Sequence, residues 1–169
     1  MSSSRGLSRW WRHLRVDRGE LRRCFPDALL REIEVRVGAA EAGHGAELRV
    51  AIEPSLGLAD VWRRRTPRER ALEVFGSLRV WDTEGNNGVL LYVLLADRAV
   101  EIVADRAAAR AIGDHRWDEV ARALADAYRS ADWAGGTLAA IDRINALLAE
   151  AFPAAGRNPD ELPNRPVML

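Results

Sequence analysis

The chain has 169 residues, 48% hydrophobic and 30% charged, a composition typical of one folded domain with a buried core. Its 25 Lys and Arg residues equal its 25 Asp and Glu residues, and this zero net charge argues against a domain that binds nucleic acid over its whole surface. The single cysteine, Cys24, excludes an intrachain disulfide framework and a zinc site built from cysteines. No apolar run reaches the roughly 18 residues that a membrane-spanning helix needs.

The N-terminal segment, residues 1–23, is predicted to be a basic helical arm. It carries seven arginines against two acidic residues, together with the pair Trp10 and Trp11. It has no apolar stretch of the length that a secretory signal requires, so the protein is predicted to be cytoplasmic. Two interpretations of the arm stay open. One is a helix that packs on its own domain or on a partner subunit, and the other is a helix that contacts a membrane surface through the two tryptophans.

The next segment changes from a helical to a strand pattern. Apolar residues at helical spacing predict a helix over residues 26–42. The period-two pattern of residues 46–53 predicts a strand with one face toward the core, and residues 55–65 are expected to form a connection. His44 lies between two glycines and is expected in an exposed turn.

A second helix is predicted to begin at Pro67. In the sequence Thr66-Pro67-Arg68-Glu69, the threonine is suited to the N-cap, the proline to the first helical position and the glutamate to the third. The Thr66 hydroxyl and the Glu69 carboxylate can each accept a hydrogen bond from a backbone N–H that the helix leaves unpaired.

A β-hairpin is predicted after this helix. Residues 88–96 are apolar at almost every position, which is typical of a central strand with helices on both faces. Asp97 and Arg98 then lead to a second strand, Ala99–Ala104, and so short a link permits only an antiparallel pair. The remainder is predicted to be helical up to residue 153.

These elements predict an α/β fold with the order α-β-α-β-β-α-α. The expected architecture is a three-layer α-β-α sandwich around a small mixed sheet of three or four strands. The expected organisation is a basic arm over residues 1–23, one domain over residues 24–153 and a tail over residues 154–169. The prolines of the tail predict no regular structure, and its apolar end is expected to dock on the domain.

The loop of residues 81–88, before the apolar strand, is dense in oxygen ligands. Asp82, Glu84, Asn86 and Asn87 bring together two carboxylates and two amide oxygens, which suit Ca²⁺ or Mg²⁺. The alternative interpretation is an acidic turn whose side chains cap backbone N–H groups.

Asp105 and Arg106 directly follow the second strand of the hairpin. Because the two strands are antiparallel, the start of the first and the end of the second lie at one edge of the sheet, where ligands often bind. Asp105 is therefore expected beside the acidic loop. The candidate metal ligands are Asp82, Glu84, Asn87 and Asp105. The alternative for Asp105 is a turn or helix cap that forms a salt bridge with Arg106.

Two strings around the hairpin resemble the TPM-domain family, which includes thylakoid-lumen and photosystem II repair proteins and many bacterial proteins. They are RVWDTEGNNGVLLYV, residues 79–93, and LADRAVEIVADR, residues 95–106. The resemblance extends in both directions, over about residues 24–169. The chain looks most similar to short bacterial cytoplasmic members that lack a signal peptide and a membrane anchor.

The resemblance implies an α-β-α sandwich, a cleft at the Asn-Gly-Val loop where family members bind divalent metal, and an acid-phosphatase activity attributed to plant members. Two positions depart from the family pattern. Asn86 stands where many members carry Asp, and Ala104-Asp105-Arg106 replaces a Gly-Tyr-Gly. The change at Asn86 removes one carboxylate ligand, and Asp105 can supply another.

Three functions follow as hypotheses. The first is a module that binds a divalent cation and a protein partner, with little or no catalysis. The second is a metal-dependent phosphatase in which Arg106 contacts the phosphate. The sequence offers no evident general base or covalent nucleophile beside the acidic loop, which favours binding over hydrolysis, and the catalytic residues stay unassigned. The third is an interaction protein at the inner membrane surface that uses the arm with Trp10 and Trp11.

Overall fold

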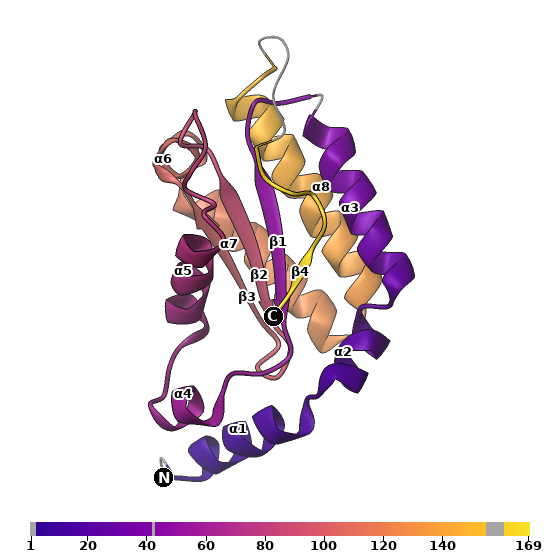
Figure 1. Cartoon of the computed structure of the whole chain (residues 1–169), viewed down its shortest axis with the longest axis vertical. Helices are drawn as coiled ribbons and strands as arrows, with labels where there is room; N and C mark the ends of the chain where they lie inside the picture. Colours follow the sequence, from indigo (N-terminus) through magenta and orange to yellow (C-terminus); the bar gives the residue numbers. More distant parts are fainter. Residues whose placement is uncertain (1–2, 42, 155–160) are drawn as a thin grey trace.

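The computed structural model describes residues 3–41, 43–154 and 161–169. Over these residues the chain forms a four-stranded sheet covered by helices, so the predicted α/β class is confirmed (Figure 1). The strands are β1 (Leu48–Glu53), β2 (Val89–Leu94), β3 (Ala99–Ala104) and β4 (Val167–Met168). The helices are α1 (Ser3–Arg15), α2 (Arg18–Cys24), α3 (Asp27–Glu41), α4 (Leu58–Trp62), α5 (Pro67–Ser77), α6 (Arg106–Ile112), α7 (Asp114–Arg129) and α8 (Trp133–Ala151).

The sheet is mixed, with the strand order β3-β2-β1-β4. β1 runs parallel to β2, with Leu48 opposite Val89, and β4 runs parallel to β1. β2 and β3 form the predicted antiparallel hairpin, with Val89 opposite Ala104. The starts of β1 and β2 and the end of β3 therefore lie at one edge of the sheet.

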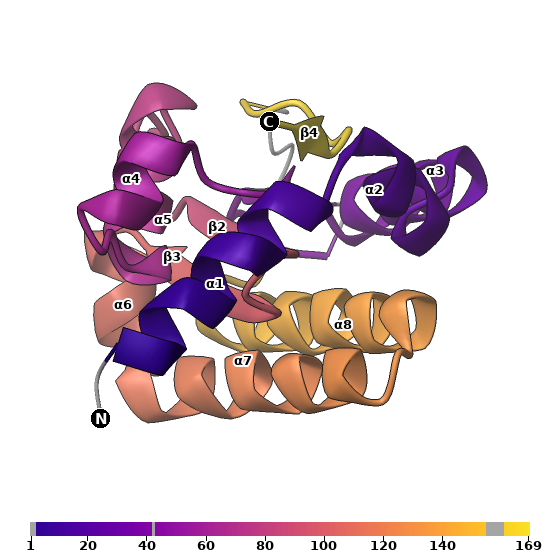
Figure 2. The same cartoon turned by 90° about the horizontal axis from the view of Figure 1, so that it is seen from below.

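Helices cover both faces of the sheet (Figures 1 and 2). Both faces of β2 are buried. Val89, Leu91 and Val93 belong to the core shared with α3, α7 and α8. The intervening residues Leu90 and Tyr92 belong to a second core beneath α5. A strand that is buried on both sides needs apolar residues throughout, which is the pattern that the sequence showed.

The capped helix start is confirmed in detail. Thr66 accepts a hydrogen bond from the Glu69 backbone N–H at 3.2 Å, and the Glu69 carboxylate accepts from the Thr66 backbone N–H at 2.8 Å. This reciprocal pair satisfies two backbone donors at the N-terminus of α5. The cap fixes where α5 begins, and α5 then leads into the acidic loop.

Three elements differ from the sequence prediction. The expected connection over residues 55–65 contains the single-turn helix α4, which is too short for a periodic pattern to mark it. Three helices follow the hairpin where the predicted order has two, because the short helix α6 begins directly after Asp105. The basic arm is divided into α1 and α2, because Asp17 caps a new helix by accepting from the Gly19 and Glu20 N–H groups.

The tail is the fourth difference. Residues 155–160 lie outside the described residues. The prediction that the tail has no regular structure is wrong for β4, a short strand that runs parallel to β1. Arg49 donates hydrogen bonds to the carbonyls of Pro163 and Arg165, and the Leu169 N–H donates to the Ile52 carbonyl at 3.0 Å. A proline directly before an edge strand leaves the strand's own N–H groups free to pair. The end of the chain thus pairs with β1.

The arm packs on its own domain, which is the first of the two interpretations of the sequence. α1 lies beside α4 across the hairpin end of the sheet (Figures 1 and 2). Trp10 is half-buried against the core beneath α5, whereas Trp11 is exposed. Of the helices described, none is long and apolar enough to cross a membrane.

Candidate functional site

The candidate site is at the edge of the sheet where β2 begins and β3 ends. We call residues 86–88 together with Asp105 the rim. Gly88 is required there by close packing, because a Cβ atom at this position would lie 1.9 Å from the Val80 carbonyl oxygen. The backbone therefore folds tightly against the residues that follow α5, and this contact fixes the position of Asn87.

The predicted proximity of Asp105 to the acidic loop is confirmed by backbone hydrogen bonds. The Asp105 N–H donates to the Gly88 carbonyl at 2.8 Å, and the Ala107 N–H donates to the Asn86 carbonyl at 2.9 Å. The two bonds continue the hydrogen-bond pattern of the hairpin beyond Val89 and Ala104, and they hold the loop against the start of α6. Residues that are almost 20 positions apart thus meet at the rim.

The Asn87 side chain is buried, with 5% of its surface exposed. Its Nδ2 donates to the Gly45 carbonyl at 2.6 Å, and its backbone N–H donates to Thr83 Oγ1 at 3.2 Å. Its Oδ1 is buried and has no hydrogen-bond partner among the described residues. Since the amide nitrogen is held by Gly45, the oxygen is directed away from that bond and is free to accept.

Asp105 is buried as well, with 8% of its surface exposed. Its Oδ1 accepts from the Arg106 backbone N–H at 2.7 Å, so Asp105 is the N-cap of α6, as in the alternative interpretation. The cap uses one oxygen, and Oδ2 is buried without a partner in the described part of the chain. Buried acceptors are normally paired, so these two oxygens at one end of the sheet are suited to accept from a donor or to coordinate a cation.

The other predicted ligands are less closely gathered. Asp82 and Glu84 are exposed on the loop. In residues 3–41, 43–154 and 161–169, no group of three His, Cys, Asp or Glu side chains is arranged to hold a metal ion, so Asp82, Glu84 and Asp105 do not form a three-carboxylate cluster. Arg106 is exposed, and none of the ion pairs between described residues involves it, so the expected salt bridge from Asp105 is absent.

The tail approaches the same loop, which the sequence did not predict. The Glu161 carboxylate accepts from the Glu84 backbone N–H at 3.0 Å. Glu47 is buried just before β1, and its Oε2 accepts from the Leu162 N–H at 3.3 Å. The period-two pattern assigned Glu47 to the outward face of a strand, and the tail that covers this face is the reason why it is buried.

His44 also differs from its prediction, because it is buried and not in an exposed turn. Its Nε2 lies 3.3 Å from Asn145 Oδ1, and the residue bridges to Pro153 at the end of α8. Burial lowers the pKa of His44 below its usual value. The neutral ring therefore has a structural role in joining the entry to β1 with α8.

Another largely buried carboxylate, Asp97, whose side chain is 9% exposed, lies at the opposite end of the hairpin. Arg9 Nη2 is 2.8 Å from its Oδ2, and His13 Nε2 and Arg12 Nη2 lie 3.2 and 3.3 Å from its Oδ1. His13 Nδ1 in turn accepts from the Leu56 N–H at 3.0 Å. We call Asp97 and these three residues the latch, because they hold α1 against the sheet.

The charges of the latch stabilise the carboxylate of Asp97. Burial alone would raise the pKa of Asp97, but hydrogen bonds from His13 and Arg9 and their positive charge outweigh it and hold the pKa well below its usual range. The sequence prediction treated Asp97 as half of a short turn, since nothing in the local pattern marks a partner that lies more than 80 residues away in the arm.

Comparison with known proteins agrees with this architecture. A family model described as the TPM domain matches residues 23–147. Five solved chains match, and one is the NMR structure of the BA42 protein from the psychrophilic bacterium Bizionia argentinensis. It shares 26% sequence identity and a TM-score of 0.74, and the match covers 84% of this chain and 93% of that chain. No curated protein matches the chain significantly.

The family match covers well over half of the chain and includes β1, the β2–β3 hairpin and the rim between them. The solved neighbour has the same fold over most of both chains. The protein therefore belongs to the TPM-domain family.

Proposed function

We propose that the protein is a binding module that holds a divalent cation at the rim and engages a protein partner. The observation that carries the proposal is the pair of buried, unpartnered oxygens, Asn87 Oδ1 and Asp105 Oδ2, on two segments joined by the Asp105–Gly88 backbone bond. Both groups are hard oxygen donors and one is a carboxylate, which fits Ca²⁺ or Mg²⁺ better than a softer metal.

The remaining ligand positions suit water and nearby loop groups. Ca²⁺ takes roughly six to eight oxygens, and Mg²⁺ usually keeps several waters. Asp82 and Glu84 are exposed on the loop and would add negative charge, through water or by a shift of the loop. Asn87 and Asp105 are the essential pair in this proposal, with Asp82 and Glu84 as secondary ligands.

The test is calorimetric titration of the full chain with Ca²⁺ and with Mg²⁺. Asp105→Asn keeps an acceptor for the α6 cap but removes the charge, so it should weaken cation binding at least tenfold, in line with the cost of losing a charged hydrogen-bonding group. Asp82→Asn should weaken binding only a few-fold. Asp126→Asn is the matched control, because Asp126 is an exposed carboxylate on α7 that pairs with Arg129. Equal affinities in wild type and Asp105→Asn would refute the rim as the cation site.

The phosphatase alternative rests on the family resemblance. A cation at the rim would polarise phosphoryl oxygens, and Arg106, exposed beside Asp105, would pair with the phosphate. Hydrolysis of a chromogenic phosphate ester should then require added metal and should fall in both Asp105→Asn and Arg106→Ala. Hydrolysis that survives both substitutions would come from a different site.

The third candidate function is contact with a membrane surface, and exposed aromatic residues favour it. Trp11 on α1 is exposed, and Trp62 on the neighbouring helix α4 is 84% exposed. Arg63 and Arg64 follow Trp62 and are exposed as well. Tryptophan beside arginine suits the interface of an anionic bilayer.

Sedimentation with vesicles tests this candidate. The full chain should bind vesicles that contain phosphatidylserine more strongly than vesicles of phosphatidylcholine alone, and the pair Trp11→Ser with Trp62→Ser should abolish the difference. Trp81→Ser is the control, because Trp81 is also an exposed tryptophan but lies in the loop after α5. Equal sedimentation with both kinds of vesicle would remove this candidate.

A further inference from the structure

β3 is the outermost strand on one side of the sheet, so no other strand in the described part of the chain pairs with its outer edge. The Asp105 N–H bonds to Gly88, and the antiparallel register alternates bonded and non-bonded pairs, so the odd-numbered residues of β3 bond to β2. The even-numbered residues Val100, Ile102 and Ala104 therefore turn their N–H and C=O groups to the free edge.

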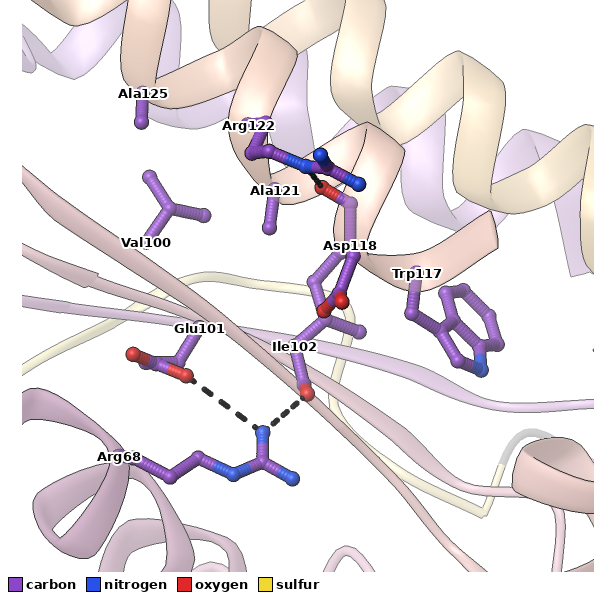
Figure 3. Close-up of a pocket in the computed structure, with 9 residues that line it drawn as sticks. All are labelled: Arg68, Val100, Glu101, Ile102, Trp117, Asp118, Ala121, Arg122 and Ala125. Atoms are coloured by element: carbon purple, nitrogen blue, oxygen red, sulfur yellow. Dashed lines mark hydrogen bonds and ion pairs between the residues drawn. The ribbon is translucent and has the colours of Figure 1, made fainter. Parts of the chain in front are cut away.

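A groove follows this free edge, as Figure 3 shows. It has a volume of about 470 Å³, with Arg68 of α5 on one side and Asp118, Ala121 and Arg122 of α7 on the other. A second cavity of about 420 Å³ shares several of these residues and continues along the strand to Ala104 and the start of α7. The outward residues of β3 thus lie along one continuous groove.

One of the outward groups already has a side-chain partner. Arg68 Nη1 donates to the Ile102 carbonyl at 2.6 Å and lies 3.7 Å from Glu101 Oε2. Of the side chains in the described residues, Arg68 is the one that bonds to the outward backbone groups of β3. Exposed strand edges readily pair with another chain, and a long charged side chain across the edge is a common form of protection. Arg68 can leave this position because it rises from the helix surface on a flexible stem.

The charges of the groove indicate what it would accept. Glu101 is half-buried beside Arg68, and Asp118 lies on the opposite side of the groove (Figure 3). Burial raises the pKa of Glu101, and the Asp118 charge raises it further, while Arg68 lowers it. Arg122 is held along its own helix by a bond from Nε to the Asp118 carbonyl at 3.1 Å. A cationic group between the two carboxylates would relieve their repulsion.

We propose that an extended peptide segment of a partner protein docks along the free edge of β3 as a fifth strand, with a Lys or Arg side chain between Glu101 and Asp118. The backbone groups of Val100, Ile102 and Ala104 would supply the hydrogen-bond ladder, as in other complexes formed by strand addition. Two small residues of α7 that line the groove, Ala121 and Ala125, leave room for the apolar side chains of such a peptide. The proposal does not depend on a cation at the rim.

The test begins with a random 12-residue peptide library displayed on phage and selected on the full chain. Enriched peptides should alternate apolar residues with others and carry Lys or Arg near the centre. A synthetic copy of an enriched peptide, titrated into isotope-labelled protein, should shift the amide signals of Val100, Ile102 and Ala104 most strongly. Selection should give the same result with and without Mg²⁺.

Val100→Pro is the main variant, because it removes an outward N–H without breaking a bond to β2. It should reduce peptide affinity roughly tenfold, which is the scale of one lost hydrogen bond together with a poorer fit. A far-ultraviolet circular dichroism spectrum should show that the variant keeps the fold. Asp118→Asn should reduce affinity for the basic peptide several-fold. Glu119→Gln is the matched control on the same helix, since Glu119 is exposed and does not line the groove, and it should leave affinity unchanged.

Three results would overturn the proposal. One is a library that yields no enriched peptide, and another is a peptide whose affinity is the same for wild type and Val100→Pro. The third is a concentration-dependent dimer, seen by light scattering, that Val100→Pro abolishes, because the occupant of the edge would then be a second copy of this chain.

Discussion

Each end of the β2–β3 hairpin carries an aspartate whose side chain is largely buried, and the two side chains differ in their partners. Asp97 is surrounded by Arg9, Arg12 and His13, so both of its oxygens have charged partners from the protein. Asp105 uses one oxygen to cap α6 and leaves the other buried and unpartnered among the described residues. The first carboxylate is fully satisfied within the chain, and the second is available for a ligand.

This difference would separate a structural site, at Asp97, from the proposed binding site at Asp105. A buried carboxylate with a complete set of partners stabilises the packing of two segments, here α1 and the hairpin turn, and has nothing left with which to bind. A buried carboxylate with a free oxygen is unfavourable until a ligand fills the position. Burial alone therefore does not identify a functional aspartate, and the partners of each oxygen do.

The largest expected effect is at the latch. Asp97→Asn removes the negative charge that Arg9 and the buried His13 face, so the free energy of unfolding should fall by about 3 kcal/mol. Urea unfolding at neutral pH measures this. Asp126→Asn removes an exposed ion pair and should cost less than about 1 kcal/mol. If Asp97→Asn is as stable as wild type, the partners of Asp97 do not stabilise the fold, and Asp97 and Asp105 do not differ in their structural contribution.

The next prediction concerns pH. Because the folded-state pKa of Asp97 is depressed, its contribution is fully present above the unfolded pKa of about 4 and is lost as pH falls below it. The stability difference between wild type and Asp97→Asn should therefore shrink by about 1 kcal/mol from pH 7 to pH 3. Urea unfolding of both proteins across this range tests it, and a gap that stays constant would show that the Asp97 pKa is normal.

A smaller effect is expected at the residue that holds Asn87. Thr83 is buried, and its hydroxyl accepts from the Asn87 N–H at 3.2 Å. Thr83→Val keeps the shape and removes the acceptor, so it should cost about 1 kcal/mol in unfolding free energy. It should also weaken cation binding by misplacing Asn87. Loss of stability with unchanged cation affinity would mean that Asn87 is not a ligand.

The smallest expected effect is at Asp105. Without added cation, Asp105→Asn should change the unfolding free energy by less than about 0.5 kcal/mol, because asparagine caps helices as well as aspartate does. With Ca²⁺ or Mg²⁺ at a concentration that saturates wild type, wild type should gain more stability than Asp105→Asn, by the amount that their difference in affinity predicts. Thermal unfolding with and without cation measures both. A variant that unfolds far more easily without cation would identify Asp105 as structural, like Asp97.

Much of the fold follows from local pattern. The apolar run that forms β2, the capping sequence before α5 and the short link between β2 and β3 each favour the structure that is found. Their consequence, that Asp105 meets the acidic loop, depends on topology alone. Single-turn α4 and strand β4 carry too few residues for a period to appear.

The finer features of the site depend on contacts between distant segments. Asp97 acquires its partners from an arm more than 80 residues away, and Glu47 is buried by the tail. The density of acidic residues in the loop drew attention to Asp82 and Glu84, yet the buried oxygens belong to Asn87 and Asp105. When a remote segment buries a side chain, the residues next to that side chain in the sequence do not predict its burial.

The most direct measurement of the central claim is a cation titration of the isotope-labelled full chain, followed through its backbone amide signals. We predict saturable shifts for Asn87, Gly88 and Asp105 at the rim, with no comparable shift at Asp97, and we predict that Asp105→Asn moves their midpoint to an at least tenfold higher cation concentration. Saturable shifts elsewhere that leave the rim unchanged, or the same midpoint in Asp105→Asn, would contradict the account.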